Sequence, residues 1–418
     1  MTEPVWVIGV GADGFLALSG AARSALDAST WLAGGRRHLE LIATANRELF
    51  TISNNVADLV ARLQLRGQRE RCVVLASGDP LLFGIGTVLI NALGNDQVRI
   101  EPAVSSMQLA FSRTGLAWHD AAIVTVHGRP LKPALLPLLG VEKIGIFTTD
   151  GQGPSEIASF LLDRGAVDYV ACVCERLGTC NERVTHARLP ELIGQVFDPL
   201  NVVILRLDRS SNRGDSSEKF MQREDCVLAD EDFVGPATGP ILLTHADVRA
   251  LVVQRFRGLR QSGPIWDVGA GLGGVSVSLA DSFRDREVVA FERDVGRLGY
   301  LRANRAKFGA FNLRVVEGSA PACFAGESES PAGVFLGGSG GNLAIILEAI
   351  TARLATGGVL VANFIAIQHL AYTMSCLHQK GWSRAVTMVQ ISQERSLGGA
   401  TTFLPLRPVW VVHAVAPA

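Results

Sequence analysis

Around residue 270 the chain reads Pro264-Ile265-Trp266-Asp267-Val268-Gly269-Ala270-Gly271-Leu272-Gly273-Gly274 and continues as Val275-Ser276-Val277-Ser278-Leu279-Ala280. An apolar run reaches an acidic residue, breaks into glycines and then resumes, which predicts a strand, a tight turn and a helix. Glycines allow positive φ and let the backbone approach a ligand closely, and the start of the helix offers unpaired N–H groups. We therefore predict a nucleotide-type binding loop rather than a glycine-rich turn without a ligand.

The spacing of these glycines fits two classes of cofactor loop. One is the G-x-G-x-x-G fingerprint of dinucleotide-binding enzymes, which uses Gly269, Gly271 and Gly274. The other is the D-x-G-x-G-x-G loop of S-adenosylmethionine-dependent methyltransferases, which uses Asp267 followed by Gly269, Gly271 and Gly273. The spacing alone leaves a dehydrogenase and a methyltransferase open.

An acidic residue, Glu292, ends the next predicted strand, 287–291. A carboxylate at such an exposed strand end can accept both ribose hydroxyls of a nucleoside in either class. The following strands end in Gly318-Ser319-Ala320-Pro321 and in Gly337-Gly338-Ser339-Gly340-Gly341, and Gly357-Gly358 precedes a later strand. This order of elements favours the methyltransferase.

Composition sets further limits. A chain of 418 residues is expected to form two or three domains, and a net charge of −1 provides no basic field for nucleic acid. No apolar stretch of membrane-spanning length occurs and no basic leader precedes the first apolar run, so we expect a cytoplasmic protein without a membrane segment. The seven cysteines form no C-x-x-C pair, and Cys172, Cys174 and Cys180 lack zinc spacing. We therefore expect reduced thiols and no metal site.

The first half repeats one pattern three times, in which a predicted strand runs directly into a turn of small residues. These turns contain Gly9-Val10-Gly11, Ser77-Gly78-Asp79 and Val104-Ser105-Ser106. Because strand ends of a parallel sheet meet at one edge, we expect the three turns to form one ligand site. Ser19 is expected to cap a helix that runs to Asp27. The basic turn Arg36-Arg37-His38 is an equally good candidate for anion binding and for a solvated turn.

A polar, glycine-containing segment without apolar periodicity, Ser210–Lys219, predicts a linker. We extend it over the acidic run Ala229-Asp230-Glu231-Asp232, which is expected to be solvated. The predicted divisions are a first domain at 1–207, a linker at 208–235 and a second domain at 236–418. Near the start of the second domain, Thr244 is expected to cap a helix.

Residues 1–207 resemble the tetrapyrrole methylase family, in the branch that methylates carbon 5 of a precorrin. The motifs that carry the resemblance are Gly9-Val10-Gly11, Ala76-Ser77-Gly78-Asp79-Pro80, Pro102-Ala103-Val104-Ser105-Ser106-Met107-Gln108, His127-Gly128-Arg129, Val173-Cys174-Glu175-Arg176-Leu177-Gly178 and Glu182-Arg183-Val184. The resemblance implies two α/β subdomains with the cofactor folded between them. It places cofactor contacts on Gly9, Gly11, Gly78, Asp79, Ser105 and Ser106. The first loop departs from the family's G-x-G-P-G-D, since it reads Gly-Val-Gly-Ala-Asp-Gly.

Residues 236–418 resemble the Rossmann-like corrin methyltransferases that methylate carbon 15 and decarboxylate. The resemblance is carried by Trp266-Asp267-Val268-Gly269-Ala270-Gly271, Phe291-Glu292-Arg293, Gly318-Ser319-Ala320-Pro321 and Gly337-Gly338-Ser339-Gly340-Gly341. It implies cofactor contacts at Thr244, Gly269, Ala270, Gly271, Leu272, Gly273, Glu292 and Ala320. Two acids common in that family are missing, since Ser319 and Ala332 stand in their places.

Together the two resemblances imply an α/β, bifunctional S-adenosylmethionine-dependent methyltransferase of cobalamin biosynthesis with one cofactor site per half. It would methylate carbons 5 and 15 of a corrin precursor and remove the ring C acetate carboxyl. Because the substrate carries many carboxylates, arginines are its expected partners. The candidates are Arg36, Arg37, Arg129, Arg249 and Arg293. No acid or base of the reaction is identified, and a homo-oligomer is expected.

Three alternatives stay open at this point. The first is the equivalent enzyme for a cobalt-containing substrate, and the second is an NAD-dependent oxidoreductase with an accessory domain. The third is a non-catalytic tetrapyrrole carrier, which the two missing acids favour.

Overall fold

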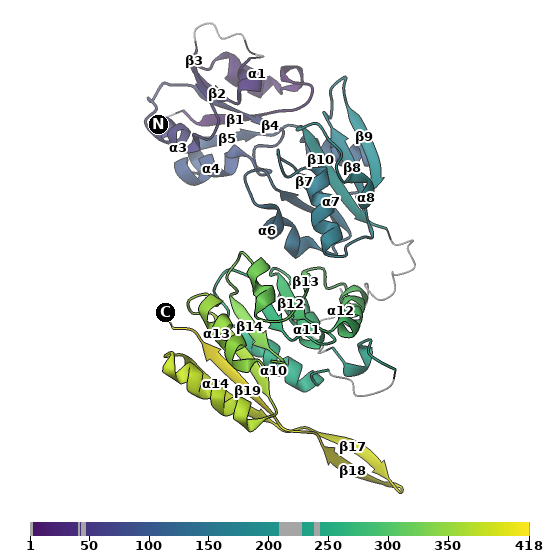
Figure 1. Cartoon of the computed structure of the whole chain (residues 1–418). Coiled ribbons are helices and arrows are strands. Elements are labelled where there is room, and N and C mark those ends of the chain that lie inside the picture. The colour runs from purple at the N-terminus through teal and green to yellow at the C-terminus, as the bar shows by residue number, and fades with distance from the viewer. Residues whose placement is uncertain (1–2, 41, 43–46, 209–227, 238–242, 418) are drawn as a thin grey trace. The chain divides into compact units, whose positions relative to one another are not determined.

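The computed structural model describes residues 3–40, 42, 47–208, 228–237 and 243–417. The chain forms two compact units (Figure 1). The first comprises Met1–Arg129, Glu142–Ala158 and Tyr169–Arg206, and the second comprises Leu207–Ala418 with two short segments, Pro130–Val141 and Ser159–Asp168.

The first unit begins with a five-stranded sheet in the order β3-β2-β4-β1-β5. Its strands are β1 (Val5–Val10), β2 (Trp31–Gly34), β3 (Glu48–Thr51), β4 (Cys72–Ser77) and β5 (Val98–Glu101). They alternate with α1 (Gly20–Asp27), α2 (Arg36–Leu39), α3 (Val56–Gln64) and α4 (Ile85–Leu93). Every pairing is parallel, so the strand ends share one edge as expected. Ser19 caps α1 as predicted, with its Oγ accepting from the Ala22 amide at 3.1 Å.

A second five-stranded sheet follows, in the order β6-β7-β10-β8-β9. Its strands are β6 (Ala122–Thr125), β7 (Lys143–Phe147), β8 (Tyr169–Glu175), β9 (Arg183–Arg188) and β10 (Asn201–Leu207). The helices of this region are α5 (Ser106–Thr114), α6 (Leu131–Leu135), α7 (Pro154–Asp163) and α8 (Leu189–Leu192). β6 and β7 are parallel, whereas β7 with β10 and β8 with β9 are antiparallel. Two successive α/β subdomains are thus present, which confirms the predicted fold class for this half.

The second unit is built on a seven-stranded sheet in the order β13-β12-β11-β14-β15-β19-β16. Its strands are β11 (Ile265–Val268), β12 (Val288–Glu292), β13 (Leu313–Glu317), β14 (Gly333–Leu336), β15 (Val359–Phe364), β16 (Ser383–Val389) and β19 (Val409–Val415). The first five in spatial order are parallel, and β19 is antiparallel to both of its neighbours. From β11 the chain adds β12 and β13 on one side and then returns to add β14 and β15 on the other side, so the strand order reverses between β11 and β14. Ligands bind at such a switch point, outside the carboxyl ends of the strands.

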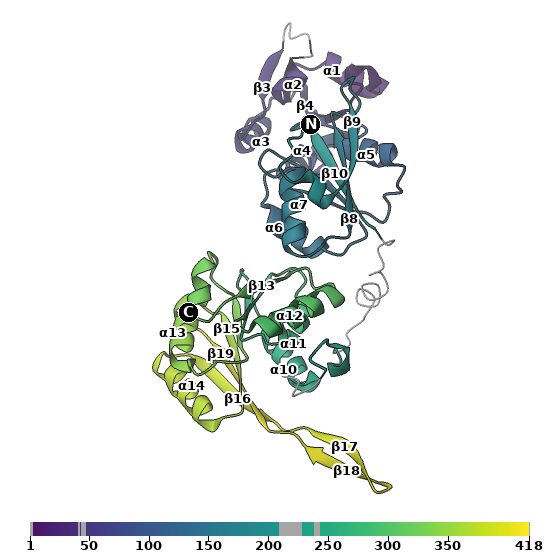
Figure 2. The same cartoon turned by 45° about the vertical axis from the view of Figure 1, so that its right-hand side comes forward.

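Helices cover both faces of this sheet, as the predicted Rossmann-like fold requires (Figure 2). They are α10 (Ala246–Phe256), α11 (Gly274–Ser282), α12 (Val295–Lys307), α13 (Leu343–Arg353) and α14 (Ile367–Gln379). One core cluster joins Phe256 of α10 and Leu301 of α12 to the sheet. A separate cluster joins Ile350 of α13 and Leu377 of α14 to the sheet. The parallel strands are therefore buried on both faces, which explains their nearly continuous apolar sequences.

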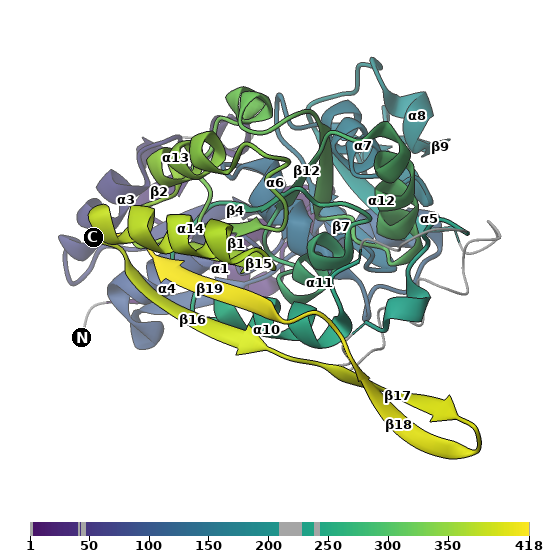
Figure 3. The same ribbon diagram turned by 60° about the horizontal axis from the view of Figure 1, so that its bottom comes forward.

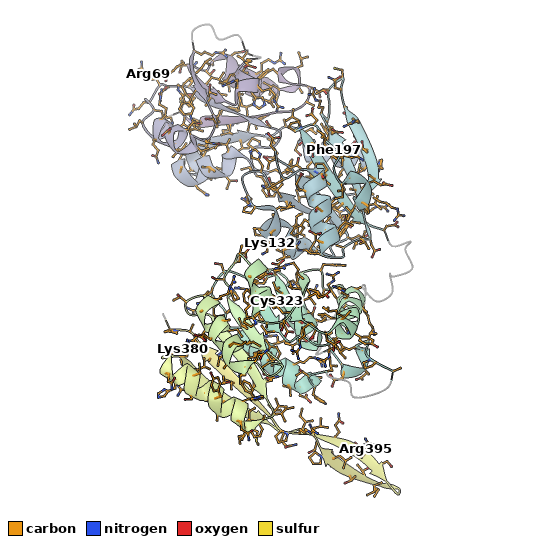
Figure 4. The ribbon with its side chains drawn as sticks, viewed as in Figure 1. Arg69, Lys132, Phe197, Cys323, Lys380 and Arg395 are labelled. Carbon is orange, nitrogen blue, oxygen red and sulfur yellow. The ribbon has the colours of Figure 1, made fainter. Side chains whose placement is uncertain are left out.

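A hairpin that the sequence analysis did not anticipate interrupts the end of the second unit. Strands β17 (Ser392–Leu397) and β18 (Ala400–Pro405) pair only with each other and form a separate two-stranded sheet. Figure 3 shows this hairpin extending beyond the seven-stranded sheet, and Figure 4 places Arg395 on it, away from the body of the unit. An isolated two-stranded hairpin is only marginally stable in water. A further contact that covers this hairpin would therefore stabilise it.

The predicted linker needs one correction. Ser210–Lys219 lies outside the described residues, but the acidic run that was expected to be solvated packs on the second unit. Leu228 is 2% exposed within the core, and the ring of Phe233 lies 4.7 Å from that of Phe308. Asp230 pairs with the fully buried Arg249, which would otherwise be an uncompensated charge.

Candidate functional sites

A cavity of about 800 Å³ lies within the first unit, at the carboxyl edge of its parallel sheet. The first subdomain contributes the ends of β1, β2 and β4, and the second subdomain contributes Thr125, His127, Thr148 and Cys174. Its volume is that of a pocket for a cofactor or a sizeable ligand. The cavity therefore occupies the place where the three small-residue turns were expected to converge.

Five of the six predicted cofactor contacts in this unit line the cavity. They are Gly11, Gly78, Asp79, Ser105 and Ser106. Gly9 does not line it, because it is buried where backbones cross: a Cβ on Gly9 would lie 2.1 Å from the Gly78 carbonyl oxygen. The requirement for glycine at residue 9 comes from packing between β1 and the turn after β4.

Ser105 and Gly78 hold the edge of the cavity in shape. Ser105 caps α5, with its Oγ accepting from the Gln108 amide at 3.2 Å while the Gln108 side chain accepts from the Ser105 amide at 2.9 Å. Gly78 has φ +61°, and a Cβ there would lie 2.8 Å from Ser105 Cα. The N-terminus of α5 is thereby fixed beside the cavity, where its free N–H groups can meet a polar ligand.

The basic turn Arg36-Arg37-His38, a candidate for anion binding in the sequence, contributes Arg37 and His38 to the lining of the cavity. Arg37 Nη2 donates to Ser77 Oγ at 3.3 Å, and His38 Nε2 lies 3.4 Å from the same oxygen. All three residues line the cavity, and His38 is only 7% exposed. Burial, followed by the charge of Arg37, lowers the pKa of His38. Of the predicted substrate arginines in this unit, Arg37 therefore lines the cavity, whereas Arg36 and Arg129 do not.

Two strained residues also line this cavity. Among the described residues other than glycine, Phe83 (φ 55°) and Arg176 (φ 49°) are the ones with positive φ. Such backbone strain concentrates at ligand sites, where the surrounding structure enforces it. Neither residue type signals this conformation, so the sequence could not have revealed it.

A second cavity, of about 110 Å³, lies in the second unit at the switch point of the seven-stranded sheet. Of the predicted cofactor contacts, Gly269, Glu292 and Ala320 line it. Ser319 lines it as well, so this departure from the family pattern falls at the site itself. Ala332, the other departure, is fully buried at the opposite end of β14, where an acid would lie in the core.

The glycine loop after β11 adopts the conformation that its sequence predicts. Gly269, Gly271 and Gly273 have φ of 77°, 61° and 88°. A Cβ on Gly269 would lie 2.7 Å from the Gly338 carbonyl oxygen, and one on Gly273 would lie 2.3 Å from Leu301 Cδ1. Ala270, Gly271, Leu272 and Gly273 shape the loop and are not among the residues that line the cavity, so their expected contact with a cofactor stays a prediction.

Glu292 is not the exposed strand-end charge that was expected. It is 4% exposed, and its carboxylate accepts from three backbone amides. Oε2 accepts from Gly271 at 2.7 Å, while Oε1 accepts from Arg293 and Asp294 at 2.9 Å each. Since a carboxylate accepts about four hydrogen bonds, capacity for a ligand hydroxyl remains on Oε2. Glu292 thus holds the glycine loop and lines the cavity at once.

Asp267, at the carboxyl end of β11, is a fully buried acid. Ser276 Oγ donates to its Oδ2 at 2.5 Å, and its Oδ1 has no partner. Burial, reinforced by the nearby charge of Glu292, raises the pKa of Asp267 to about 7. The two acids beside the glycine loop therefore differ in their hydrogen bonding: three backbone amides donate to Glu292, whereas Ser276 is the donor to Asp267 and leaves its Oδ1 without a partner.

Three further predictions in the second unit can be compared with the structure. Thr244 neither caps α10 nor lines the cavity: His245 is the cap residue, and the Thr244 carbonyl accepts from Arg249 at 2.6 Å. Arg249 is used in that buried contact and not at the cavity. Arg293 does line the cavity, together with Arg297, which the sequence analysis missed.

The described residues contain no group of three or more His, Cys, Asp or Glu side chains placed to hold a metal ion. Six cysteines fall in the described ranges and are free thiols, while Cys226 lies outside them. No helix in the described ranges combines the length and the apolar character needed to cross a membrane.

Comparison with known protein families matches each half of the chain separately. Residues 4–193 match the tetrapyrrole (corrin/porphyrin) methylases, and residues 239–415 match the precorrin methyltransferase domain. The fold and the two cavities therefore define a fusion of two methyltransferase domains of corrin biosynthesis. This result selects the methyltransferase interpretation of the glycine loop over the dinucleotide one.

Whole-chain similarity narrows the assignment. A decarboxylating precorrin-6Y C(5,15)-methyltransferase from Sinorhizobium sp. is 33% identical over 408 residues, which is 96% of this chain and 94% of that protein. The chain belongs to the family of decarboxylating precorrin-6Y C(5,15)-methyltransferases, which are S-adenosylmethionine-dependent enzymes.

Two shorter relatives from Salmonella typhimurium each cover less than half of this chain. A cobalt-precorrin-7 C(5)-methyltransferase is 35% identical over 178 residues, 43% of this chain and 87% of that protein. A decarboxylating cobalt-precorrin-6B C(15)-methyltransferase is 33% identical over 186 residues, 44% of this chain and 94% of that protein.

Proposed function

We propose that this chain methylates carbons 5 and 15 of precorrin-6Y and removes the ring C acetate carboxyl, which yields precorrin-8X. The observation that carries the proposal is the presence of two separate glycine-lined cavities, one in each compact unit. The substrate has two acceptor carbons and the protein has one cavity in each unit. Each cavity can therefore serve one of the two methyl transfers.

S-adenosylmethionine is the proposed donor in both sites. In the first unit, Gly11, Gly78, Asp79, Ser105 and Ser106 would hold it. In the second unit, Gly269, Glu292 and Ala320 would hold it. Gly78 and Gly269 allow the close backbone crossings that shape the two cavities, and the remaining acceptor capacity on Glu292 fits a ribose hydroxyl of a nucleoside. Bound there, the cofactor supplies an activated methyl group.

The protein's own contribution is mainly positioning. A conjugated tetrapyrrole has electron-rich carbons between its rings, so the rate depends on aligning the acceptor carbon with the methyl and sulfur atoms. Arg37 and Arg176 line the first cavity and Arg293 and Arg297 line the second, where each can pair with a carboxylate of the substrate. Loss of the acetate carboxyl leaves an electron pair that the macrocycle can absorb.

We assign methylation of carbon 5 to the first unit, and methylation of carbon 15 with decarboxylation to the second. Two observations support this division: one short relative is named for carbon 5 alone, and another is named for carbon 15 with decarboxylation. Neither aligns with more than 44% of this chain, in keeping with two separable activities.

We also propose that the chain self-associates through the β17–β18 hairpin. Leu397 is 70% exposed and Phe403 is 65% exposed on this two-stranded element. The pairing of Leu397 with Ala400 and of Phe403 with Glu394 puts the two side chains on opposite faces of the hairpin, so each face presents an exposed apolar side chain. A second copy of the same chain carries the same two exposed apolar side chains and could pair with either face.

The decisive experiment supplies the full chain with methyl-labelled S-adenosylmethionine and with substrate labelled in the acetate carboxyl. Incubation with the metal-free and the cobalt-containing substrate, followed by mass analysis, should show two methyl groups gained and labelled carbon dioxide released from the metal-free one. Conversion of the cobalt form alone would reassign the substrate. Binding without any methyl transfer would favour a carrier, and oxidation of the substrate with NAD would favour a dehydrogenase.

A further inference from the structure

The two proposed reactions differ in the group that the macrocycle loses after the methyl group is added. At carbon 15, the departing carboxyl leaves an electron pair behind, so the charge added with the methyl group can be neutralised without a base. At carbon 5 nothing leaves except a proton. Methylation in the first unit therefore releases a net proton and requires an acceptor for it, whereas methylation with decarboxylation in the second unit releases no net proton.

Ser77, His38 and Arg37 form the group in the first cavity that meets this requirement. Ser77 ends β4 and is exposed, whereas His38 is 7% exposed, and both residues line the cavity. The guanidinium of Arg37 can only donate, so Ser77 Oγ accepts from it at 3.3 Å. The Ser77 hydroxyl proton is then free to be donated to His38 Nε2, 3.4 Å away.

We propose that Ser77 and His38 form the proton-accepting pair for methylation of carbon 5, an inference that rests on the function proposed above. The bond between carbon 5 and the methyl carbon forms as the bond between methyl and sulfur breaks, and the electron pair of the broken bond leaves with sulfur. Carbon 5 then loses its proton to Ser77 Oγ, and the electron pair of that C–H bond returns to the macrocycle. The Ser77 proton passes to His38 Nε2, which becomes an imidazolium and later releases its proton to solvent.

The surroundings keep this pair ready to accept a proton. Burial and the charge of Arg37 lower the pKa of His38, so the neutral imidazole prevails at neutral pH. The other titratable or charged side chains lining the cavity are Asp79, His127, Cys174 and Arg176. On the helix of His38 itself, Arg36 and Glu40 flank it. Asp79 is engaged by its own turn, where its Oδ1 accepts from the Leu81 amide at 2.8 Å.

The test compares His38→Asn with His119→Asn in the full chain. His119 is exposed and does not line the cavity, so it controls for the loss of a histidine. Proton transfer by a positioned base contributes about 10²–10⁴-fold to a rate, so His38→Asn should lower kcat for carbon 5 methylation by about 10²-fold or more. KM and the Kd for S-adenosylmethionine should change little. Release of carbon dioxide, measured with substrate already methylated at carbon 5, should stay at the wild-type rate.

Three readouts separate a proton acceptor from a structural residue. The wild-type rate should fall as pH drops through the lowered pKa of His38, below 6.5, and His38→Asn should lose this acid limb. Imidazole in solution should restore part of the activity of His38→Asn. Ser77→Ala should be slow, while Ser77→Thr, which keeps the hydroxyl, should retain most of the activity.

Several results would overturn the inference without touching the proposed function. They are a wild-type kcat in His38→Asn, an unchanged acid limb, or loss of carbon 5 methylation in His127→Asn but not in His38→Asn. Failure of the proposed function itself would be seen in the wild-type chain, as the absence of carbon 5 methylation.

Discussion

The backbone amide of Gly271 donates to Glu292 Oε2 at 2.7 Å, which ties the glycine loop after β11 to the end of the neighbouring strand β12. The same carboxylate accepts from the amides of Arg293 and Asp294, so it also holds the turn between β12 and α12. A residue whose position predicts a ligand contact therefore also determines the shape of the loop. Substitutions at Glu292 must affect stability and binding together.

Glu292→Ala should lower the stability of the second unit by about 1–3 kcal/mol, because three buried backbone donors lose their acceptor. It should also weaken binding of S-adenosylmethionine to that unit. Urea unfolding and calorimetric titration of the full chain would measure the two effects. Glu317→Ala is the matched control, because Glu317 lies opposite Glu292 in the β12–β13 register but is exposed. Equal stability of Glu292→Ala and Glu317→Ala would contradict the structural role.

Gly78→Ala and Gly269→Ala should abolish different methylations. An added Cβ would lie 2.8 Å from Ser105 Cα in the first case and 2.7 Å from the Gly338 oxygen in the second, and both glycines have positive φ. Gly78→Ala should therefore stop methylation at carbon 5 and Gly269→Ala at carbon 15, each by deforming one cavity. Products formed from intermediates that need only one methyl group would be identified by mass. A folded variant inactive at both carbons would show that the two sites are not independent.

The stability of the second unit should depend on the ionisation of Asp267. Burial raises the pKa of this carboxyl from 3.8 to about 7, so the folded unit binds a proton that the unfolded chain has released in this range. Stability should therefore rise as pH falls from about 7 towards 4, and Asp267→Asn should lack this component. Urea unfolding of both proteins at several pH values gives the difference, with the exposed Asp247→Asn as control. Parallel pH profiles for wild type and Asp267→Asn would refute the assignment.

Leu397→Asp combined with Phe403→Asp should reduce self-association without unfolding the chain. Both side chains lie on the β17–β18 hairpin, outside the seven-stranded sheet, so a charge there leaves the core intact. Sedimentation over a range of protein concentrations would measure the change. Leu65→Asp in the first unit provides the control, because Leu65 is 83% exposed and lies far from the hairpin in sequence. If wild-type protein sediments as a monomer throughout, the hairpin does not mediate self-association.

Local sequence determined the two cofactor loops and the fold classes. Gly269, Gly271 and Gly273 stand directly after an apolar strand, and their left-handed backbone is a local requirement that few other residues meet. The same holds for Gly78, and for Ser105, whose capping box with Gln108 lies within four residues of sequence. Patterns of this kind can be read without knowing what lies next to them in space.

Only the tertiary structure decided which polar groups meet. The pairing of β2 with β4 brings Arg37 and His38 to Ser77 across about 40 residues of sequence, and no local pattern specifies which strands become neighbours. Arg249 and Arg37 were equal candidates for substrate binding in the sequence. In the structure Arg249 is buried and paired with Asp230, whereas Arg37 lines a cavity. The physical reason is that conformational preferences act over a few residues, whereas solvation, charge and proton affinity depend on every atom that packing brings near.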